Sequence, residues 1–246
     1  MGDCCIRGIQ WDTVPTGRNA KLAGHDCYVT GDNQDVGIMI IHDLFGWTFP
    51  NTRILADHYA AEVNATVYIP DFFGGEVVSA EVVMDQNRWG EFDLPGFIAR
   101  NSKDTRWPEI LECAKALRAW HARTGAIGFC YGAWGVIRLG AKGTQLVDCI
   151  SAAHPTLLEK EEIEKIGVPV QIMAPEFDPQ FTAELKAFSN RVIPGLGVAY
   201  DYQYFPGLEH GFAVRGNPRD PAEMKGMERA KNSAVLWFRQ WLRHSE

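Results

Sequence analysis

Short apolar segments alternate with longer amphipathic segments along most of this chain. Runs rich in β-branched residues predict six buried strands, at residues 36–41, 65–70, 125–129, 147–153, 168–174 and 200–205. Helical periodicity is found in the segments between and after them, at residues 50–63, 105–122, 133–142, 180–192 and 221–243. Alternation of this kind predicts a parallel sheet that is covered by helices on both faces.

The residues before the first of these strands follow a different pattern. Residues 4–35 include the turn-rich stretch TGRNAKLAGHDCYVTGDN, which predicts an antiparallel hairpin or meander. In the last predicted helix, one face carries Ala230, Ala234, Phe238, Trp241 and Leu242, so we expect it to pack on the sheet. We find no repeat or linker, and therefore expect residues 1–246 to form one α/β domain with a mainly parallel sheet of about eight strands.

Composition and charge limit the kinds of molecule that this protein is expected to bind. The chain has 246 residues, of which 46% are hydrophobic, enough for one sizeable globular core. Its net charge is −7 and no Lys/Arg cluster occurs, which argues against binding to nucleic acid or to an anionic membrane. Neither a signal-peptide pattern nor an apolar run of membrane-spanning length is found, so a cytoplasmic location is expected. The sequence leaves both a monomer and a homodimer open.

The cysteines do not form a disulfide or metal pattern. No CxxC pair and no zinc-type spacing with histidine occurs among Cys4, Cys5, Cys27, Cys113, Cys130 and Cys149. Reduced thiols are therefore expected. The neighbouring His42 and Asp43 lack a third ligand nearby, so neither a metal nor an organic cofactor is expected.

One cysteine lies in a sequence context that favours catalysis. Cys130 is in the stretch GFCYGAWG, between the predicted strand 125–129 and the predicted helix 133–142. Such a strand, turn and helix form a nucleophile elbow, in which Gly128 and Gly132 avoid collisions with neighbouring backbone. The positive end of the following helix favours a thiolate. The alternative is a buried cysteine that packs a tight turn.

Two possible partners of Cys130 follow later strands. Asp178 lies 48 residues after Cys130, beyond the predicted strand 168–174, and His210 lies a further 32 residues on, beyond strand 200–205. Taken alone, an aspartate before proline, such as Asp178, is more often a turn-former or helix cap, and a histidine beside glycine, such as His210, is more often a loop residue. Together they follow the order of nucleophile, acid and histidine of an α/β hydrolase, at strand ends where such folds bind ligands. The three residues predict a catalytic triad.

These motifs resemble those of the dienelactone hydrolase family of α/β hydrolases. The resemblance rests on GFCYGAWG, on FD before a proline, on EHGF, IHDLFGW and PDFFGGE, and it extends from about residue 20 to the C-terminus. It implies an α/β-hydrolase fold and a triad of Cys130, His210 and Asp178. It also implies that a small-molecule ester or enol-lactone is cleaved through an acyl-thioester.

The resemblance extends to residues around the triad. Asp43 stands where bacterial members have a glutamate that contacts the resting cysteine, while eukaryotic members share the pattern DxFGW. Arg100 and Arg215 are similar in position to arginines that surround a substrate carboxylate in the family. The alternative for both arginines is a solvated surface charge.

The remaining expectations concern the oxyanion and the substrate pocket. The backbone N–H groups of Tyr131 and Leu44 are the expected oxyanion donors. Phe45, Trp47 and Phe212 lie in strand-end loops and are expected to line an apolar pocket. Two alternatives stay open. One is hydrolysis or cyclisation of a bulkier, polyketide-like ester or thioester, and the other is a non-catalytic ligand-binding protein on the same fold.

Overall fold

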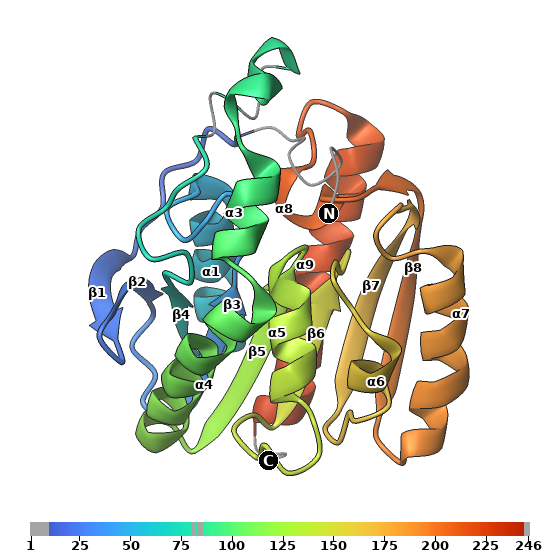
Figure 1. Ribbon diagram of the computed structural model, residues 1–246. Helices are drawn as coiled ribbons and strands as arrows, with labels where there is room; N and C mark the ends of the chain where they lie inside the picture. Colours follow the sequence, from blue (N-terminus) through green and yellow to red (C-terminus); the bar gives the residue numbers. More distant parts are fainter. Residues whose placement is uncertain (1–9, 80–81, 83–85, 244–246) are drawn as a thin grey trace.

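The computed structural model describes residues 10–79, 82 and 86–243, and its centre is one twisted sheet (Figure 1). The strands follow the spatial order β1-β2-β4-β3-β5-β6-β7-β8. Their bounds are β1 Arg18–Leu22, β2 His25–Thr30, β3 Val36–Ile41, β4 Thr66–Pro70, β5 Arg123–Phe129, β6 Cys149–Ala153, β7 Val170–Phe177 and β8 Tyr200–Glu209.

The sheet is mainly parallel, as the sequence predicts. Strands β1 and β2 form an antiparallel hairpin, and β2 also pairs antiparallel with β4. All pairs from β4 through β3, β5, β6 and β7 to β8 are parallel. The expected hairpin before the first parallel strand is confirmed over 18–30, whereas residues 1–9, with Cys4 and Cys5, lie outside the described part of the chain.

Helices cover both faces of the sheet. Helices α1 and α9 pack together on one face, and α4, α5 and α6 lie on the other (Figure 1). The α-helices are α1 Pro50–Val63, α3 Leu94–Arg100, α4 Lys103–Trp120, α5 Gly132–Leu139, α6 Lys160–Ile163, α7 Ala183–Val192, α8 Phe212–Arg215 and α9 Pro221–Leu242. Two short 3-10 helices span Gln86–Glu91 and Ile193–Leu196. None of the described helices is long and apolar enough to cross a membrane.

Most predicted boundaries lie within a few residues of the observed ones. Helix α4 begins two residues earlier than predicted because the Ser102 hydroxyl accepts a hydrogen bond from the Thr105 N–H and caps it. Helix α5 ends earlier, at Leu139, where the chain turns at Gly140. Helices α3, α6 and α8 were not predicted, because pieces of four to seven residues are too short to show a helical period.

Helix α9 buries the face that its pattern predicts. Ala230, Ala234, Phe238 and Leu242 are almost fully buried, and Trp241 is partly buried against the same core. Small residues on this face let the helix approach the strands closely. The inner parallel strands β3 to β6 are almost fully buried, whereas most of the edge strand β8 is half-buried or exposed. The carboxyl ends of the parallel strands present loops at one edge of the sheet.

Candidate active site

Cys130 lies at a strained turn between β5 and α5. Its backbone has a φ of +49°, in the left-handed region that non-glycine residues rarely adopt. A Cβ added at Gly128 would collide with the backbone of Gly132, and one at Gly132 would collide with the carbonyl of Ile41. Both glycines are therefore required by close backbone contact, as expected for a nucleophile elbow.

The end of β6 and the loop that follows it hold this turn in place. The Cys130 N–H donates to the Ala153 carbonyl at 3.1 Å, and the Thr156 N–H donates to the Cys130 carbonyl at 3.1 Å. The Thr156 hydroxyl also donates to the Cys130 sulfur at 3.4 Å. Both side chains are fully buried. Backbone strain of about 1–3 kcal/mol persists only where surrounding contacts support it, and these bonds supply that support.

Asp178 and His210 meet at the ends of β7 and β8. The His210 Nδ1 lies 3.0 Å from each carboxylate oxygen of Asp178, and both side chains are excluded from solvent. The N–H groups of Gln180 and Phe181 donate to the same carboxylate at 2.9 and 3.1 Å. Since a carboxylate only accepts, the proton of a neutral His210 lies on Nδ1, and Nε2 is left as the basic nitrogen.

His154 connects the two halves of the predicted triad. Its ring centroid lies 6.1 Å from that of Phe129, the neighbour of Cys130, and 5.0 Å from that of His210. The backbone φ of His154 is +38°, and neither ring nitrogen has a hydrogen-bond partner among the described residues. Burial lowers the pKa of His154 well below its usual value, and the charges of His210 and Arg215 add to this effect. His154 is therefore neutral beside His210.

The two predicted oxyanion donors have no competing acceptor. Among the residues that the structure describes, neither the Leu44 nor the Tyr131 N–H donates to a protein group. The Asp43 carbonyl, in the same peptide unit as the Leu44 N–H, accepts from His42 Nδ1 at 2.9 Å and from the Gly46 N–H at 3.1 Å. Because C=O and N–H point in opposite directions in a trans peptide, these bonds direct the Leu44 N–H away from them.

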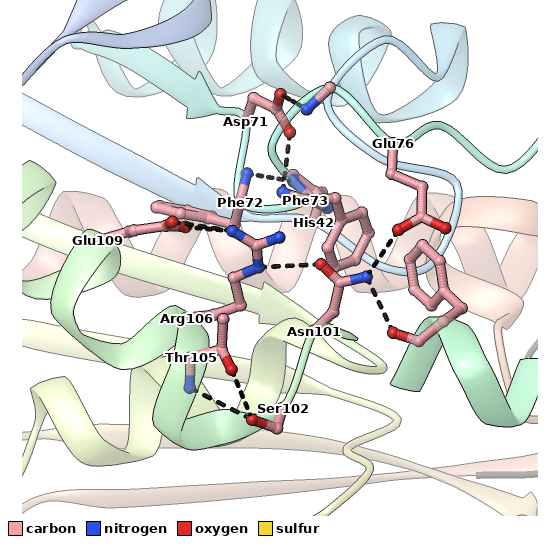
Figure 2. A network of polar contacts seen from close by, with 12 residues as sticks. His42, Asp71, Phe72, Phe73, Glu76, Asn101, Ser102, Thr105, Arg106 and Glu109 are labelled. Atoms are coloured by element: carbon pink, nitrogen blue, oxygen red, sulfur yellow. Dashed lines mark hydrogen bonds and ion pairs between the residues drawn. The ribbon is translucent and has the colours of Figure 1, made fainter. Parts of the chain in front are cut away.

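A polar network ties the loops after β3 and β4 together (Figure 2). His42 Nε2 accepts a hydrogen bond from the Phe72 N–H at 3.2 Å, and the Asp71 carboxylate accepts from the Phe73 N–H at 2.8 Å. With Nδ1 as donor and Nε2 as acceptor, His42 is satisfied only as the neutral ring. Burial lowers the pKa of His42 and maintains that state.

The same network reaches Tyr131. The Asn101 side chain accepts from Arg106 Nε at 2.9 Å and donates to Glu76 at 3.3 Å (Figure 2). The Tyr131 hydroxyl donates to the Asn101 carbonyl at 2.6 Å. The junction between α3 and α4 thus holds the residue that follows Cys130.

The two predicted substrate arginines each pair with acidic side chains of the protein. The Arg100 side chain is 54% exposed and pairs with Glu76 at 2.7 Å and Asp93 at 3.6 Å. The Arg215 side chain is buried, with Nε 2.9 Å from an Asp43 carboxylate oxygen and the guanidinium 5.1 Å from the Phe45 ring centroid. Acidic side chains of the protein thus compensate the charge of each arginine, and their convergence on one substrate carboxylate stays a prediction.

The Asp43 carboxylate has two partners within the protein. One carboxylate oxygen pairs with Arg215, and the other accepts from the Phe45 N–H at 3.0 Å. The hydrogen-bond partner of the Cys130 sulfur is Thr156 instead. Among the described residues, Asp43 therefore does not take the part of the bacterial glutamate that contacts the resting cysteine.

The predicted aromatic residues divide into two groups. Phe45 and Phe212 are buried, and Phe212 contacts the His154 ring with centroids 5.7 Å apart. Trp47 is partly buried, and Arg53 lies over its ring at 4.9 Å from the centroid.

A cavity of about 330 Å³ is lined by Phe212 together with Gly207, Leu208, Glu209, His210, Gly211, Arg215, Gly216, Asn217 and Glu223. His210 and Phe212 thus border open space, whereas the Cys130 side chain is covered.

Sequence reasoning missed four residues of this site: His42 as a structural link, Asn101, His154 and Thr156. The triplet HPT at 154–156 directly follows the predicted strand 147–153. The rule that located Asp178 and His210 at strand ends would also have located these two residues. Within the described ranges, no group of three or more His, Cys, Asp or Glu side chains could hold a metal ion.

Comparisons with known proteins agree with this architecture. Hydrolase tropI of Talaromyces stipitatus is 27% identical, over 98% of this chain and 96% of that protein. Hydrolase pyvD of Aspergillus violaceofuscus is 29% identical over 98% and 96%, respectively. The human carboxymethylenebutenolidase homolog is 26% identical over 97% and 96%.

Solved structures show the same fold. A putative dienelactone hydrolase from Klebsiella pneumoniae superposes with a TM-score of 0.71 at 14% identity, over 93% of this chain and all of that one. The expected α/β-hydrolase fold is thereby confirmed. A family model described as the dienelactone hydrolase family matches residues 26–242. The chain is therefore a hydrolase-fold protein that belongs to the dienelactone hydrolase family.

Proposed function

We propose that this hydrolase cleaves a small ester or enol-lactone, with Cys130 as nucleophile, His210 as general base and acid, and Asp178 as the residue that orients His210. The observation that carries this proposal is the buried Asp178 carboxylate, which lies 3.0 Å from His210 Nδ1. This contact leaves Nε2 of His210 as the basic nitrogen. The His210 ring packs against His154, which in turn packs against Phe129, the residue before Cys130.

The first chemical step forms an acyl-enzyme. The proton of the Cys130 thiol moves to His210 Nε2, and the sulfur attacks the substrate carbonyl carbon to form a C–S bond. We expect the Leu44 and Tyr131 N–H groups, which have no acceptor among the described residues, to stabilise the developing oxyanion. The bond between the carbonyl carbon and the ester oxygen then breaks, and the leaving oxygen takes the proton from His210.

The second step releases the acid. Water gives a proton to His210 Nε2 and its oxygen attacks the thioester carbonyl. The C–S bond breaks, the sulfur recovers its proton, and the carboxylic acid leaves. For a lactone, acid and alcohol are parts of one product. This sequence requires only groups of the chain and water.

Two observations support a substrate class. Names of relatives with similar chain lengths include dienlactone hydrolase 1 of Gibberella moniliformis and the carboxymethylenebutenolidase homologs, which favours a planar unsaturated lactone. The buried charge of Arg215 is already compensated by Asp43. We therefore infer that a substrate carboxylate is not required, and that neutral lactones and aryl esters are turned over as well as acidic ones.

A substrate screen tests the proposal. Purified protein is incubated with a carboxylate-bearing dienelactone, a neutral enol-lactone, an aryl acetate and an acyl thioester, and product formation is followed by chromatography. We expect turnover of at least the lactone or aryl ester, lost on Cys130→Ala. A folded protein that binds these compounds without hydrolysing any of them would contradict the proposal and favour a ligand-binding role.

A further inference from the structure

We propose that the Thr156 hydroxyl is a second protein group that acts on the reacting sulfur: it stabilises the thiolate form of Cys130. This inference rests on the proposed role of Cys130 as nucleophile. The observation is a hydrogen bond from Thr156 Oγ1 to Cys130 Sγ at 3.4 Å, between two side chains with no solvent exposure.

The bond is specific in several respects. Among the described residues, the sulfur is the only hydrogen-bond partner of the Thr156 hydroxyl. The Thr156 N–H donates to the Cys130 carbonyl at 3.1 Å, so backbone and side chain of one residue both hold the elbow. A neutral thiol is a weak acceptor, whereas hydrogen bonds to an ionised acceptor are about twice as strong as neutral ones. A buried hydroxyl directed at this sulfur therefore favours its ionised form.

The other polar side chains near the Cys130 sulfur have partners or surroundings of their own. Both Asp43 carboxylate oxygens are engaged, by Arg215 and by the Phe45 N–H. His154 is neutral and its ring packs against Phe129 and His210. A carboxylate beside the sulfur would oppose a thiolate by like-charge repulsion, whereas a hydroxyl donor stabilises it.

The expected chemistry follows from this bond. When the thiol proton moves to His210, Thr156 keeps its own proton and donates to the negative sulfur. The bond weakens as the C–S bond forms and the sulfur loses charge. It forms again when the thioester breaks and the sulfur leaves as a thiolate. Thr156 thus stabilises the nucleophile before attack and the leaving group during release of the acid.

Three substitutions isolate the hydroxyl. Thr156→Val keeps the shape and removes the donor, while Thr156→Ser keeps the donor and removes the methyl group. Thr124→Val is the matched control, because Thr124, like Thr156, is a buried threonine whose hydroxyl donates a hydrogen bond. Its acceptor is the Leu146 carbonyl, at 2.8 Å, and not a sulfur. Thr124 lies at the opposite end of β5, far along the strand from Cys130.

The readout is the alkylation rate of Cys130 by iodoacetamide from pH 5 to pH 9, measured by peptide mass spectrometry. At pH 7 we expect Thr156→Val to react about threefold to tenfold more slowly, because fewer molecules carry a thiolate. At pH 9 the difference should vanish or reverse, because an unstabilised thiolate is the stronger nucleophile. Charged and titratable groups of the surrounding loops are the same in all variants: His42, Asp43, His154, Asp178, His210 and Arg215.

Different results would reject the role of Thr156 and the role of Cys130 as nucleophile. Recovery of the wild-type pH profile by Thr156→Ser, with no change in Thr124→Val, would support the role of the hydroxyl. An equal rate reduction at every pH, or an unchanged profile in Thr156→Val, would overturn it. If Thr156→Val does not fold, Thr156→Ala is compared with Thr156→Ser in the same way. Turnover that survives in Cys130→Ala would instead reject the proposed nucleophile, whatever Thr156 does.

Discussion

Cys149 lies in β6 and Cys130 directly follows the neighbouring strand β5; both are fully buried, yet their surroundings differ. Cys149 is the first residue of β6, paired with Gly125, and burial raises its pKa well above the usual value. Cys130 follows the last residue of β5, at a positive φ, with a hydroxyl donor and the N-terminus of α5 beside it. Burial alone keeps a thiol protonated and inert, so reactivity depends on the polar groups that accompany burial.

The same contrast divides the whole sheet. Its carboxyl end collects histidines and carboxylates in loops, including His42, Asp43, His154, Asp178 and His210. The inner strands β3 to β6 are mostly apolar, and every residue of β3 is buried. Parallel strands that need both faces covered leave only their ends for chemistry.

The largest expected effect separates the two cysteines directly. Cys130→Ala should abolish lactone and ester turnover, a loss on the order of 10⁴-fold or more, with little change in melting temperature. Cys149→Ala should retain kcat and kcat/KM and lower the free energy of unfolding by about 1 kcal/mol, because it leaves a small core cavity. Steady-state kinetics and thermal unfolding of both variants check the pair. Comparable losses of turnover in both would remove the distinction.

Asp178→Asn tests the orientation of His210. An amide can donate to His210 Nδ1, which favours the tautomer with the proton on Nε2 and leaves no base for Cys130. We expect kcat to fall on the order of a thousandfold while the fold is preserved. Asp220→Asn is the control, because Asp220 caps helix α9 and asparagine caps equally well. Near-normal kcat in Asp178→Asn would show that His210 does not act as the base.

Replacing Arg215 or Arg100 should affect the stability of the protein to different extents, and neither replacement should affect substrate binding. Arg215→Met leaves the buried Asp43 carboxylate without its cation, and should lower the free energy of unfolding by about 3–5 kcal/mol. Arg100→Met removes an exposed ion pair and should change neither stability nor KM measurably. Urea unfolding and kinetics with acidic and neutral lactones measure both effects. A rise in KM for the acidic lactone alone, in Arg100→Met, would restore this residue as a substrate ligand.

The smallest effect concerns pH. His154 has a lowered pKa in the folded state, so below about pH 6.5 the unfolded chain binds the extra proton more readily. Stability from this group is complete above that pH and is lost as the pH falls, by at most about 1.4 kcal/mol per pH unit. His154→Asn, which tolerates a positive φ, should flatten the decline in melting temperature between pH 7 and pH 5.

His58→Asn is the control for this measurement. His58 is about half exposed on α1, beside Glu62, so its replacement should leave the slope nearly unchanged. An identical slope in wild-type protein and His154→Asn would show that His154 is protonated in the folded protein, in conflict with its buried surroundings.

Periodicity and turn chemistry were enough to predict the core of the fold. The predicted strand 36–41 and helix 50–63 match β3 and α1 residue for residue, because long buried segments carry strong patterns. Short elements such as α3 and α8 were missed, since four to seven residues do not repeat a helical period. The elbow at Cys130 was visible because glycines on both sides of it are required by close backbone contact.

Side-chain partners were harder to predict than positions. Strand-end placement identified Asp178 and His210. The pairing of Arg215 with Asp43, in contrast, joins the end of helix α8 to the loop after β3, about 170 residues apart in the chain. Arg100 projects toward Glu76, a contact between α3 and the loop after β4 that no local pattern records. His154 and Thr156 were overlooked although they follow a predicted strand, because neither belongs to a catalytic motif.

The most direct test of the account is trapping of the acyl-enzyme. Wild-type protein is mixed with an aryl ester, quenched in acid within the first turnover and digested, and the peptides are examined by mass spectrometry. We predict the acyl mass on the peptide that contains Cys130, and none on the peptide that contains Cys149. Rapid turnover with the acyl group on any other residue, or with no covalent adduct at all, would contradict the assignment of Cys130 as the nucleophile.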